Sequence, residues 1–268
     1  MNINVFELLT YFIIYSVLGW IMESTVRTVC EKKLINTGFL NGPFCPIYGI
    51  GAILMLLFLG RFEDNPILLF LLSVIILTLW EYVVGVLLEK IFKTKYWDYS
   101  KQKFNFQGRI CLVNSICWGI LGLIFIKILH PFVQNVLSKV DNNIIFYAIN
   151  LITVIFIIDT IISVVNVKNI KTTLKKIEKM NNEIKEKLKE LRKLKLKKEK
   201  EQEKSTIESV QRLIEELKKK RNRTILRLYK NVYRLKKAFP DINTKEITEV
   251  LNKKIELIKK REKNKKKT

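Results

Sequence analysis

Five long apolar runs dominate the first part of the chain and restrict what it can fold into. They cover residues 5–22, 44–60, 67–88, 110–129 and 144–165. A helix needs about 20 apolar residues to cross the hydrocarbon core of a bilayer, and four of the runs are near that length, whereas the second is at the lower limit. Because backbone polar groups in lipid must be paired within the protein, each run predicts a helix. One large soluble core is disfavoured, since little is left in this region to cover five such runs. The sequence therefore predicts an all-α membrane bundle of five transmembrane helices.

The charges divide the chain into two regions. Residues 1–167 carry 12 Lys and Arg and 10 Asp and Glu, whereas residues 168–268 carry 36 and 15. The net charges are +2 and +21. Such asymmetry indicates two regions in different surroundings. We interpret residues 1–167 as a five-helix transmembrane domain, with its fifth helix at 144–165, and residues 168–268 as a basic cytoplasmic helical tail.

The connections between the runs alternate in basic charge, which predicts the orientation. The first connection contains Arg27, Lys32 and Lys33, and the third contains six basic residues between Lys90 and Arg109. The second and fourth connections each contain a single basic residue beside acidic ones. Basic loops remain in the cytoplasm, so we expect the first and third connections and the tail to lie there, with the N-terminus outside.

A shift of 66 residues superposes two blocks of the sequence without a gap. "GWIME" falls on "GVLLE", and "LNGPFCPI" falls on "FQGRICLV". The shift matches Gly19, Glu23, Gly42 and Cys45 with Gly85, Glu89, Gly108 and Cys111. This predicts a parallel tandem repeat of two-helix units, residues 5–62 and 67–130, related by an axis along the membrane normal. The second helix is expected to begin near Pro43, because proline is favoured in a first helical turn. The fourth helix is expected to begin at the matching place in the repeat, near Arg109.

Polar residues gather near the cytoplasmic ends of the predicted helices. Ionisable groups in the hydrocarbon region are unfavourable and normally face a bundle interior or a cavity; Glu81 and Asp159 are the deepest. We expect Glu23 to pair with Arg27, and Glu23, Glu89 and Arg109 to form one cluster. Two interpretations remain open, a structural network or a ligand or ion site. The candidate residues are Glu23, Arg27, Asn41, Glu81, Glu89, Trp97, Asp98, Asn105 and Arg109.

No catalytic or nucleotide-binding motif is recognisable, and we expect neither a cofactor nor a metal. The four cysteines do not have the spacing of a zinc site, and a structural disulfide is not expected in the reducing cytoplasm. We interpret Cys45 and Cys111 as small residues at close helix crossings. His130 is expected at the outer membrane interface.

The tail has the periodicity of amphipathic helices. Taking Ile170, Ile177 and Ile184 as d positions of a heptad places Asn181 at an a position, where asparagine can fix the register of a parallel dimer. Ser205 to Glu208 has the pattern of a capping box, and a third helix is expected after Asn243. Both a helical hairpin and a self-associating coiled coil fit this pattern. The excess lysine suits anionic membrane lipids, whereas nucleic acid is a less probable partner because few aromatic residues interleave the basic ones.

Four segments of the chain resemble a bacterial membrane family described as putative ABC-transporter type IV permeases. They are "GWIMES", "NTGFLNGPFCPIYGIGA", "EYVVGVLLEKIFKTKYWDYS" and "KFNFQGRICLVNSICWG", and the resemblance covers about residues 10–165. It implies a transport role in the bacterial inner membrane, and a separate ATPase subunit, since this chain has no nucleotide-binding signature. Two alternatives remain: a membrane scaffold that recruits a partner through its basic coiled coil, and a membrane-embedded enzyme acting on lipid headgroups.

Overall fold

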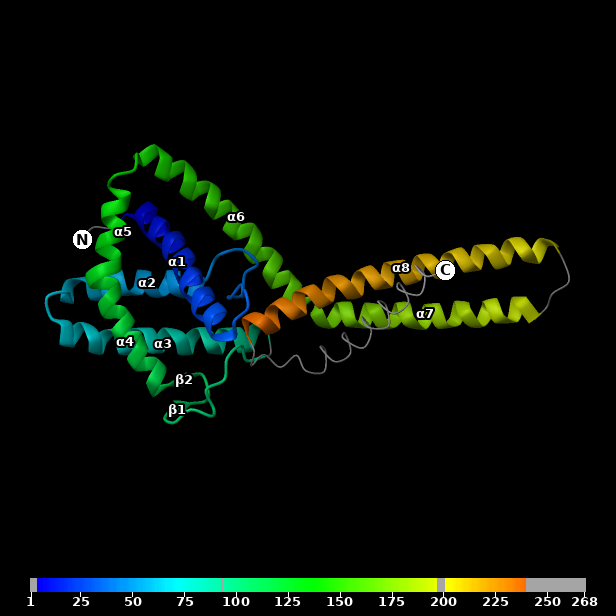
Figure 1. Ribbon diagram of the computed structural model, residues 1–268, viewed down its shortest axis with the longest axis horizontal. Helices are drawn as coiled ribbons and strands as arrows, with labels where there is room; N and C mark the ends of the chain where they lie inside the picture. The colour runs from blue at the N-terminus through cyan, green and yellow to red at the C-terminus, as the bar shows by residue number, and fades with distance from the viewer. Residues whose placement is uncertain (1–3, 93, 197–200, 240–268) are drawn as a thin grey trace. The chain divides into compact units, whose positions relative to one another are not determined.

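The computed structural model describes residues 4–92, 94–196 and 201–239, and these are mainly helical (Figure 1). The chain divides into two units. Of the described residues, the first comprises those within 4–164 and 235–239, and the second comprises those within 165–234.

Each of the five apolar runs coincides with helix in the first unit. In chain order the elements are α1 (Val5–Glu31), α2 (Pro46–Leu59) with the 3₁₀ turn η1 (Gly60–Phe62), α3 (Pro66–Phe92), α4 (Leu112–Ile124), the π-helical turn η2 (Phe125–Leu129), α5 (His130–Leu137) and α6 (Asn142–Lys168). The segments Val5–Glu31, Pro66–Phe92, Leu112–Leu137 and Asn142–Lys168 are long and apolar enough to cross a membrane. Pro46–Phe62 is apolar but shorter, as its length in the sequence predicts.

The second and fourth helical segments begin three residues later than predicted. The Cys45 backbone is not helical, and its N–H donates to the Ser16 carbonyl of α1 at 2.9 Å. Pro43 therefore lies in the loop before α2. Ahead of α4, strand β2 (Ile110–Cys111) pairs antiparallel with β1 (Asn105–Phe106), which holds Arg109 outside the helix. As a result, Cys45 and Cys111 occupy the N-cap positions of α2 and α4.

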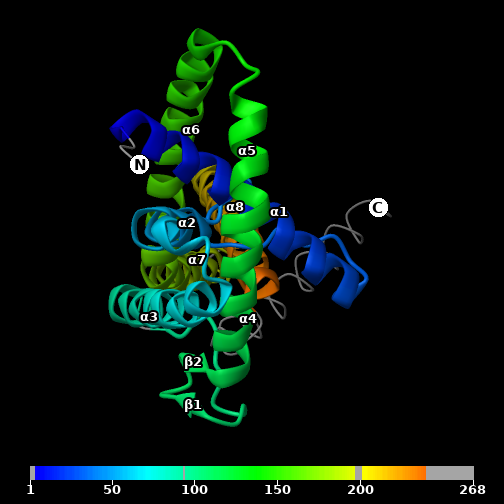
Figure 2. The same ribbon diagram turned by 90° about the vertical axis from the view of Figure 1, so that its left-hand side faces the viewer.

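Close packing joins the helices in pairs, α1 with α2 and α3 with α4 (Figure 2). A Cβ atom built on Gly49 of α2 would lie 2.2 Å from Ser16 Oγ of α1, and one on Gly122 of α4 would lie 2.2 Å from Ser73 Oγ of α3. Small residues at such crossings let helix backbones approach closely, as in membrane bundles. A shared apolar core that includes Tyr15, Met55, Leu59, Leu69 and Phe125 joins the two pairs.

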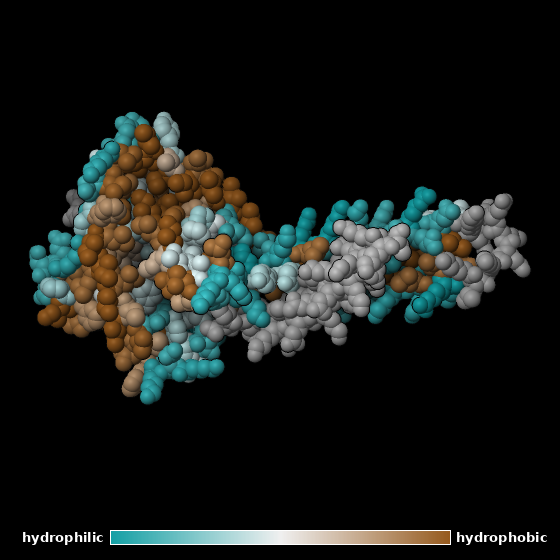
Figure 3. All heavy atoms as spheres, viewed as in Figure 1, coloured by the Kyte–Doolittle hydropathy of each residue, from teal (hydrophilic) through white to brown (hydrophobic). Residues whose placement is uncertain are grey.

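The outer surface of the first unit is largely apolar (Figure 3). On α6, Ile144, Leu151, Ile155 and Ile162 are all about half exposed or more, and only Ile149 and Ser163 are buried. A helix that exposes isoleucine and leucine to this degree suits a lipid environment rather than water.

The second unit contains α7 (Ile170–Leu196) and most of α8 (Glu201–Ala238). The two helices form a hairpin, in which the Arg221 guanidinium donates to Asn181 Oδ1 at 3.1 Å. Ile177 and Ile184 of α7 and Ile214 of α8 are at most 4% exposed, so these two heptad positions of α7 are buried within one chain. Residue 205 lies inside α8, which is already helical at Glu201, so the predicted helix start at Ser205 is wrong. The third helix expected after Asn243 lies outside the described residues.

Candidate functional site

Glu81 is a buried acidic residue of α3 and is only 3% exposed. Its carboxylate accepts hydrogen bonds from three neutral donors: Trp118 Nε1 at 2.9 Å, Tyr99 Oη at 3.1 Å and Asn114 Nδ2 at 3.4 Å. Among the described residues, no Lys, Arg or His forms an ion pair with it. Neutral donors favour the ionised form of a carboxyl group and burial favours its neutral form, and among the described residues no counter-ion adds to the first effect.

The donors reach Glu81 from outside α3. Trp118 and Asn114 lie on α4, whereas Tyr99 lies in the connection between α3 and β1. Burial and the neighbouring Glu81 carboxyl raise the pKa of Tyr99, so its hydroxyl stays protonated and remains a donor. The Asn114 amide also donates to this hydroxyl, which fixes its position.

Glu23 of α1 belongs to the same polar region. Its carboxylate accepts a hydrogen bond from Cys45 Sγ at 3.5 Å. Burial, together with this carboxyl group, raises the pKa of the Cys45 thiol, so the thiol is a neutral donor and not a nucleophile. Tyr48 of α2 and Glu81 line the same pocket. We call Glu23, Cys45, Tyr48, Glu81, Tyr99, Asn114 and Trp118 the buried acidic cluster.

A pocket adjoins this cluster between α2, α3 and α4. The pocket is small, with about 30 Å³ of space open to a water-sized sphere. Its lining is mainly apolar and aromatic, and includes Ile47, Tyr48, Gly51, Trp80, Glu81 and Trp118. Trp80 Nε1 donates to the Ile47 carbonyl at 2.9 Å, so that indole is held in place. The lining, one carboxyl group among apolar and aromatic side chains, has the character of a small-molecule site, and the volume limits what enters it to a group of a few non-hydrogen atoms.

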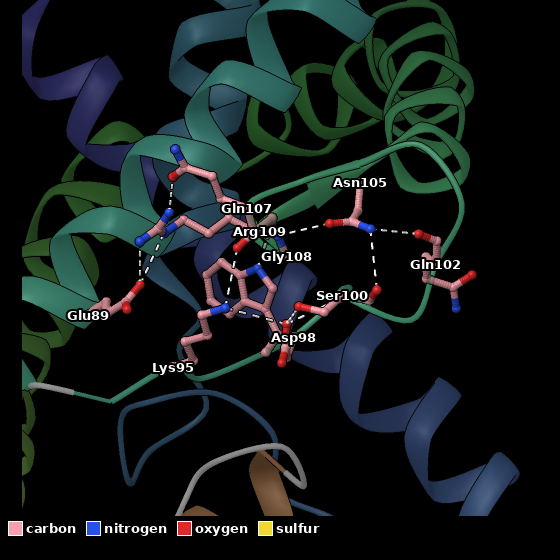
Figure 4. A network of polar contacts seen from close by, with 10 residues as sticks. Glu89, Lys95, Asp98, Ser100, Gln102, Asn105, Gln107, Gly108 and Arg109 are labelled. Carbon is pink, nitrogen blue, oxygen red and sulfur yellow. Dashed lines mark hydrogen bonds and ion pairs between the residues drawn. The ribbon is translucent and has the colours of Figure 1, made fainter.

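A second network holds the connection between α3 and α4 (Figure 4). Arg109 donates to Glu89 Oε2 through Nη2 at 2.6 Å and Nε at 3.1 Å, and also to Gln107. The Arg109 carbonyl accepts from Trp97 Nε1 at 2.9 Å. The contacts attach the loop to the C-terminal end of α3.

The remaining residues of this network bond within the loop. Asn105 Nδ2 donates to the Gln102 carbonyl at 2.8 Å, and Asn105 Oδ1 accepts from Gly108 N at 3.1 Å. Asp98 accepts from Ser100, and this hydrogen bond lowers the pKa of the Asp98 carboxyl. Asp98 is exposed, so these contacts shape the loop and do not line the pocket.

Asn41 belongs to a third group, centred on Asp159 of α6. The Asp159 carboxylate accepts from Asn41 Nδ2 at 2.9 Å, Asn41 N at 3.2 Å and Gly42 N at 2.8 Å. Asn41 Nδ2 also donates to Ser163 Oγ at 2.8 Å. These contacts attach the loop between α1 and α2 to α6. The hydrogen bonds that the backbone N–H groups of Asn41 and Gly42 donate stabilise the Asp159 carboxylate at its depth in the helix.

The structure divides the predicted cluster. Glu89 and Arg109 are paired, but no hydrogen bond or ion pair joins either of them to Glu23 in the described part of the chain. Arg27 pairs with Glu31 at 2.8 Å instead of with Glu23, and donates to the Ala238 carbonyl of the same unit at 2.7 Å. The Glu23 carboxyl accepts its hydrogen bond from Cys45 instead.

Sequence reasoning missed five members of the buried acidic cluster. They are Cys45, Tyr48, Tyr99, Asn114 and Trp118. A signal for two of them exists in the repeat, since Tyr48 and Asn114 each follow the matched cysteine by three residues. His130, expected at the outer membrane interface, is 7% exposed and bonds through Nδ1 to the Tyr15 hydroxyl at 2.7 Å, so it is buried among aromatic rings.

Replacing Glu89 with glutamine is expected to loosen the connection between α3 and α4. The variant loses a charge-assisted pair whose side chains are 18% and 34% exposed, and we expect the stability to fall by about 1 kcal/mol. Hydrogen exchange of residues 94–109 should become faster. As a control, Glu190→Gln removes the more exposed pair with Lys187 and should leave both measurements unchanged. Equal exchange rates in Glu89→Gln and the unaltered protein would contradict this assignment.

Comparison with known proteins places the fold in a family. The family model described as "Putative ABC-transporter type IV" matches residues 10–164, which includes the buried acidic cluster and the pocket. No curated protein and no solved structure matches the chain. Together with the four apolar helices, this match makes the chain a multi-pass membrane protein.

Proposed function

The chain belongs to the putative ABC-transporter type IV family, and from this premise we propose that it is a permease-like subunit that moves a solute with the help of a separate ATPase. The observation that carries the proposal is the pocket beside Glu81. A buried acidic side chain next to an aromatic pocket within membrane helices is unfavourable for stability alone, and such groups mark solute pathways.

The positions that line the pocket agree with a two-unit repeat. Ala52 and Met55 of α2 line it, and so do Trp118 and Leu121 of α4, which are their counterparts at the shift of 66 residues. The N-cap cysteines of α2 and α4 are related by the same shift. We propose that the two units enclose the solute pathway between them, as parallel repeats do in other transporters, with the short helix α2 as the fifth span.

The orientation that this proposal requires can be measured. We expect single cysteines at Lys33 and Lys101 to react with a membrane-impermeant maleimide only from the cytoplasmic side. Single cysteines at Asp64 and Asp141 should react only from outside, because the loops with fewer basic residues are translocated. Labelling in right-side-out and inverted vesicles separates the two cases. Reaction of the Asp64 position from the cytoplasm would rule out α2 as a span.

The dependence on an ATPase can be tested by purification. The full chain, isolated in mild detergent from its native cells, should carry a subunit with a Gly-x-x-x-x-Gly-Lys loop. We propose that the basic connection between α3 and α4 is the docking loop, since it holds Lys101 and Lys103 on an exposed turn. The double change Lys101→Glu and Lys103→Glu should reduce the recovered ATPase, whereas Lys185→Glu in α7 should not. Purification without any such subunit would contradict the permease proposal and favour a scaffold.

A further inference from the structure

We propose that the pocket between α2, α3 and α4 binds the ammonium group of a small organic amine. This inference rests on the proposed function, since the amine would be the transported solute or the charged end of it. It names a ligand class for a pocket whose acidic side chain has no basic partner in the described part of the chain.

The first argument is charge. Glu81 lines the pocket and is 3% exposed, and its three hydrogen-bond donors are neutral. An ionised carboxylate has about four acceptor positions, so these donors leave room for one more N–H. A cation in the pocket would favour the ionised form of this carboxyl group and pair with it, whereas an anion would be repelled and a neutral solute would supply no such attraction.

The second argument is the nature of the walls. Tyr48, Trp80 and Trp118 contribute aromatic side chains to the lining. Aromatic faces attract ammonium groups, most strongly those of tryptophan, and groups of aromatic residues recognise quaternary amines. Both indoles are held by their N–H groups, Trp80 on the Ile47 carbonyl and Trp118 on Glu81. The aromatic walls are therefore in place before a ligand arrives.

The third argument separates an organic cation from a metal ion. Calcium needs six to eight oxygen ligands, and magnesium needs six in near-octahedral geometry. The Ile47 carbonyl already accepts from Trp80, which leaves Glu81 and the Tyr48 hydroxyl as oxygen donors. Among the described residues no group of three or more His, Cys, Asp or Glu could hold a metal ion. An apolar pocket with one carboxylate suits a weakly hydrated alkylammonium ion instead.

The test is a titration of the purified full chain in detergent without any ATPase. Methylammonium, choline and tetramethylammonium chloride are added at constant ionic strength, with sodium chloride as the reference, and tryptophan fluorescence and heat are recorded. We expect at least one of the amines to give a saturable signal that sodium does not give. Absence of saturable binding for all three, or the same signal with sodium, would overturn the inference.

A glycine pair provides matched variants. A Cβ atom on Gly51 would enter the pocket at 3.4 Å from Leu77 Cδ2 and 3.7 Å from Trp80 Cδ1, which are ordinary contacts, whereas one on Gly60 would meet nothing within 4 Å. Both changes to alanine should therefore fold. We expect Gly51→Ala to weaken amine binding at least tenfold and Gly60→Ala to leave it unchanged. Unaltered binding by folded Gly51→Ala would overturn the assignment to this pocket.

Glu81→Gln tests the charge. It should abolish the preference for amines over sodium in protein that is still monodisperse. If binding persists in this variant, the carboxylate is not the recognition element and the inference fails.

Because the titration needs no partner, its result is independent of the ATPase purification. Amine binding without an ATPase would contradict the proposed function alone, and an ATPase without amine binding would contradict this inference alone.

Discussion

Replacing Gly49 with alanine is expected to separate α1 from α2 and to destabilise the first unit strongly. The new Cβ atom would stand 2.2 Å from Ser16 Oγ and 2.6 Å from the Phe12 carbonyl oxygen. Ser16 could rotate, but the Phe12 oxygen belongs to the backbone of α1, so the helices must move apart. Overpacking of this kind lowers stability by about 1–3 kcal/mol and occasionally more, and we expect the upper end of that range.

The thermal midpoint of the purified protein in detergent measures this effect. The matched control is Gly51→Ala, because it makes the same change two residues along α2, where the nearest atom would be 3.4 Å away. Alanine is favoured over glycine within a helix by about 1 kcal/mol, so the control should be as stable as the unaltered protein or slightly more so. If Gly49→Ala melts at the same temperature as Gly51→Ala, α1 and α2 do not cross at this glycine.

The positions of the helices could be predicted because hydropathy and length decide them. Each apolar run coincides with a helix, and the shortness of the second run reappears in Pro46–Phe62. The helix starts could not be predicted to the residue. Local rules favour proline in the first turn, but the start of α2 depends on a tertiary hydrogen bond from Cys45 to α1. The start of α4 depends on the pairing of β2 with β1.

The candidate site could be predicted only in part, for a similar reason. The depth of Glu81 and the cost of burying it identified a residue that needs partners. Which partners it has depends on the loop that brings Tyr99 back to α3 and on the face that α4 turns toward Glu81. In the same way, spacing along α1 permitted a pair between Glu23 and Arg27, but Arg27 bonds to Glu31, the residue one turn further on.

Replacing Glu81 with leucine is expected to be the most damaging change in the buried acidic cluster. It leaves Tyr99 Oη, Asn114 Nδ2 and Trp118 Nε1 without the acceptor that they share. Hydrogen bonds to a charged group contribute about 1.5–3 kcal/mol each, whereas removing one acidic side chain from a membrane helix recovers only about 2.5–3.5 kcal/mol. The loss of three bonds outweighs that gain, so we expect a net destabilisation of a few kcal/mol, measured as a lower thermal midpoint and a smaller monodisperse fraction.

Glutamine at residue 81 allows the hydrogen-bond assignment to be tested within this prediction. Its amide oxygen can still accept from Tyr99 and Asn114, but its NH₂ group would then face the indole N–H of Trp118, and two donors would meet. Glu81→Gln should therefore lie between the unaltered protein and Glu81→Leu in stability.

Trp118→Phe should destabilise the unaltered protein, because it removes the bond to Glu81, but should cost much less in the Glu81→Gln background, where that bond is already lost. A double-mutant cycle measures this coupling. Additive effects of the two changes would show that Trp118 does not donate to Glu81, and the buried acidic cluster would lose its link to α4 through this indole.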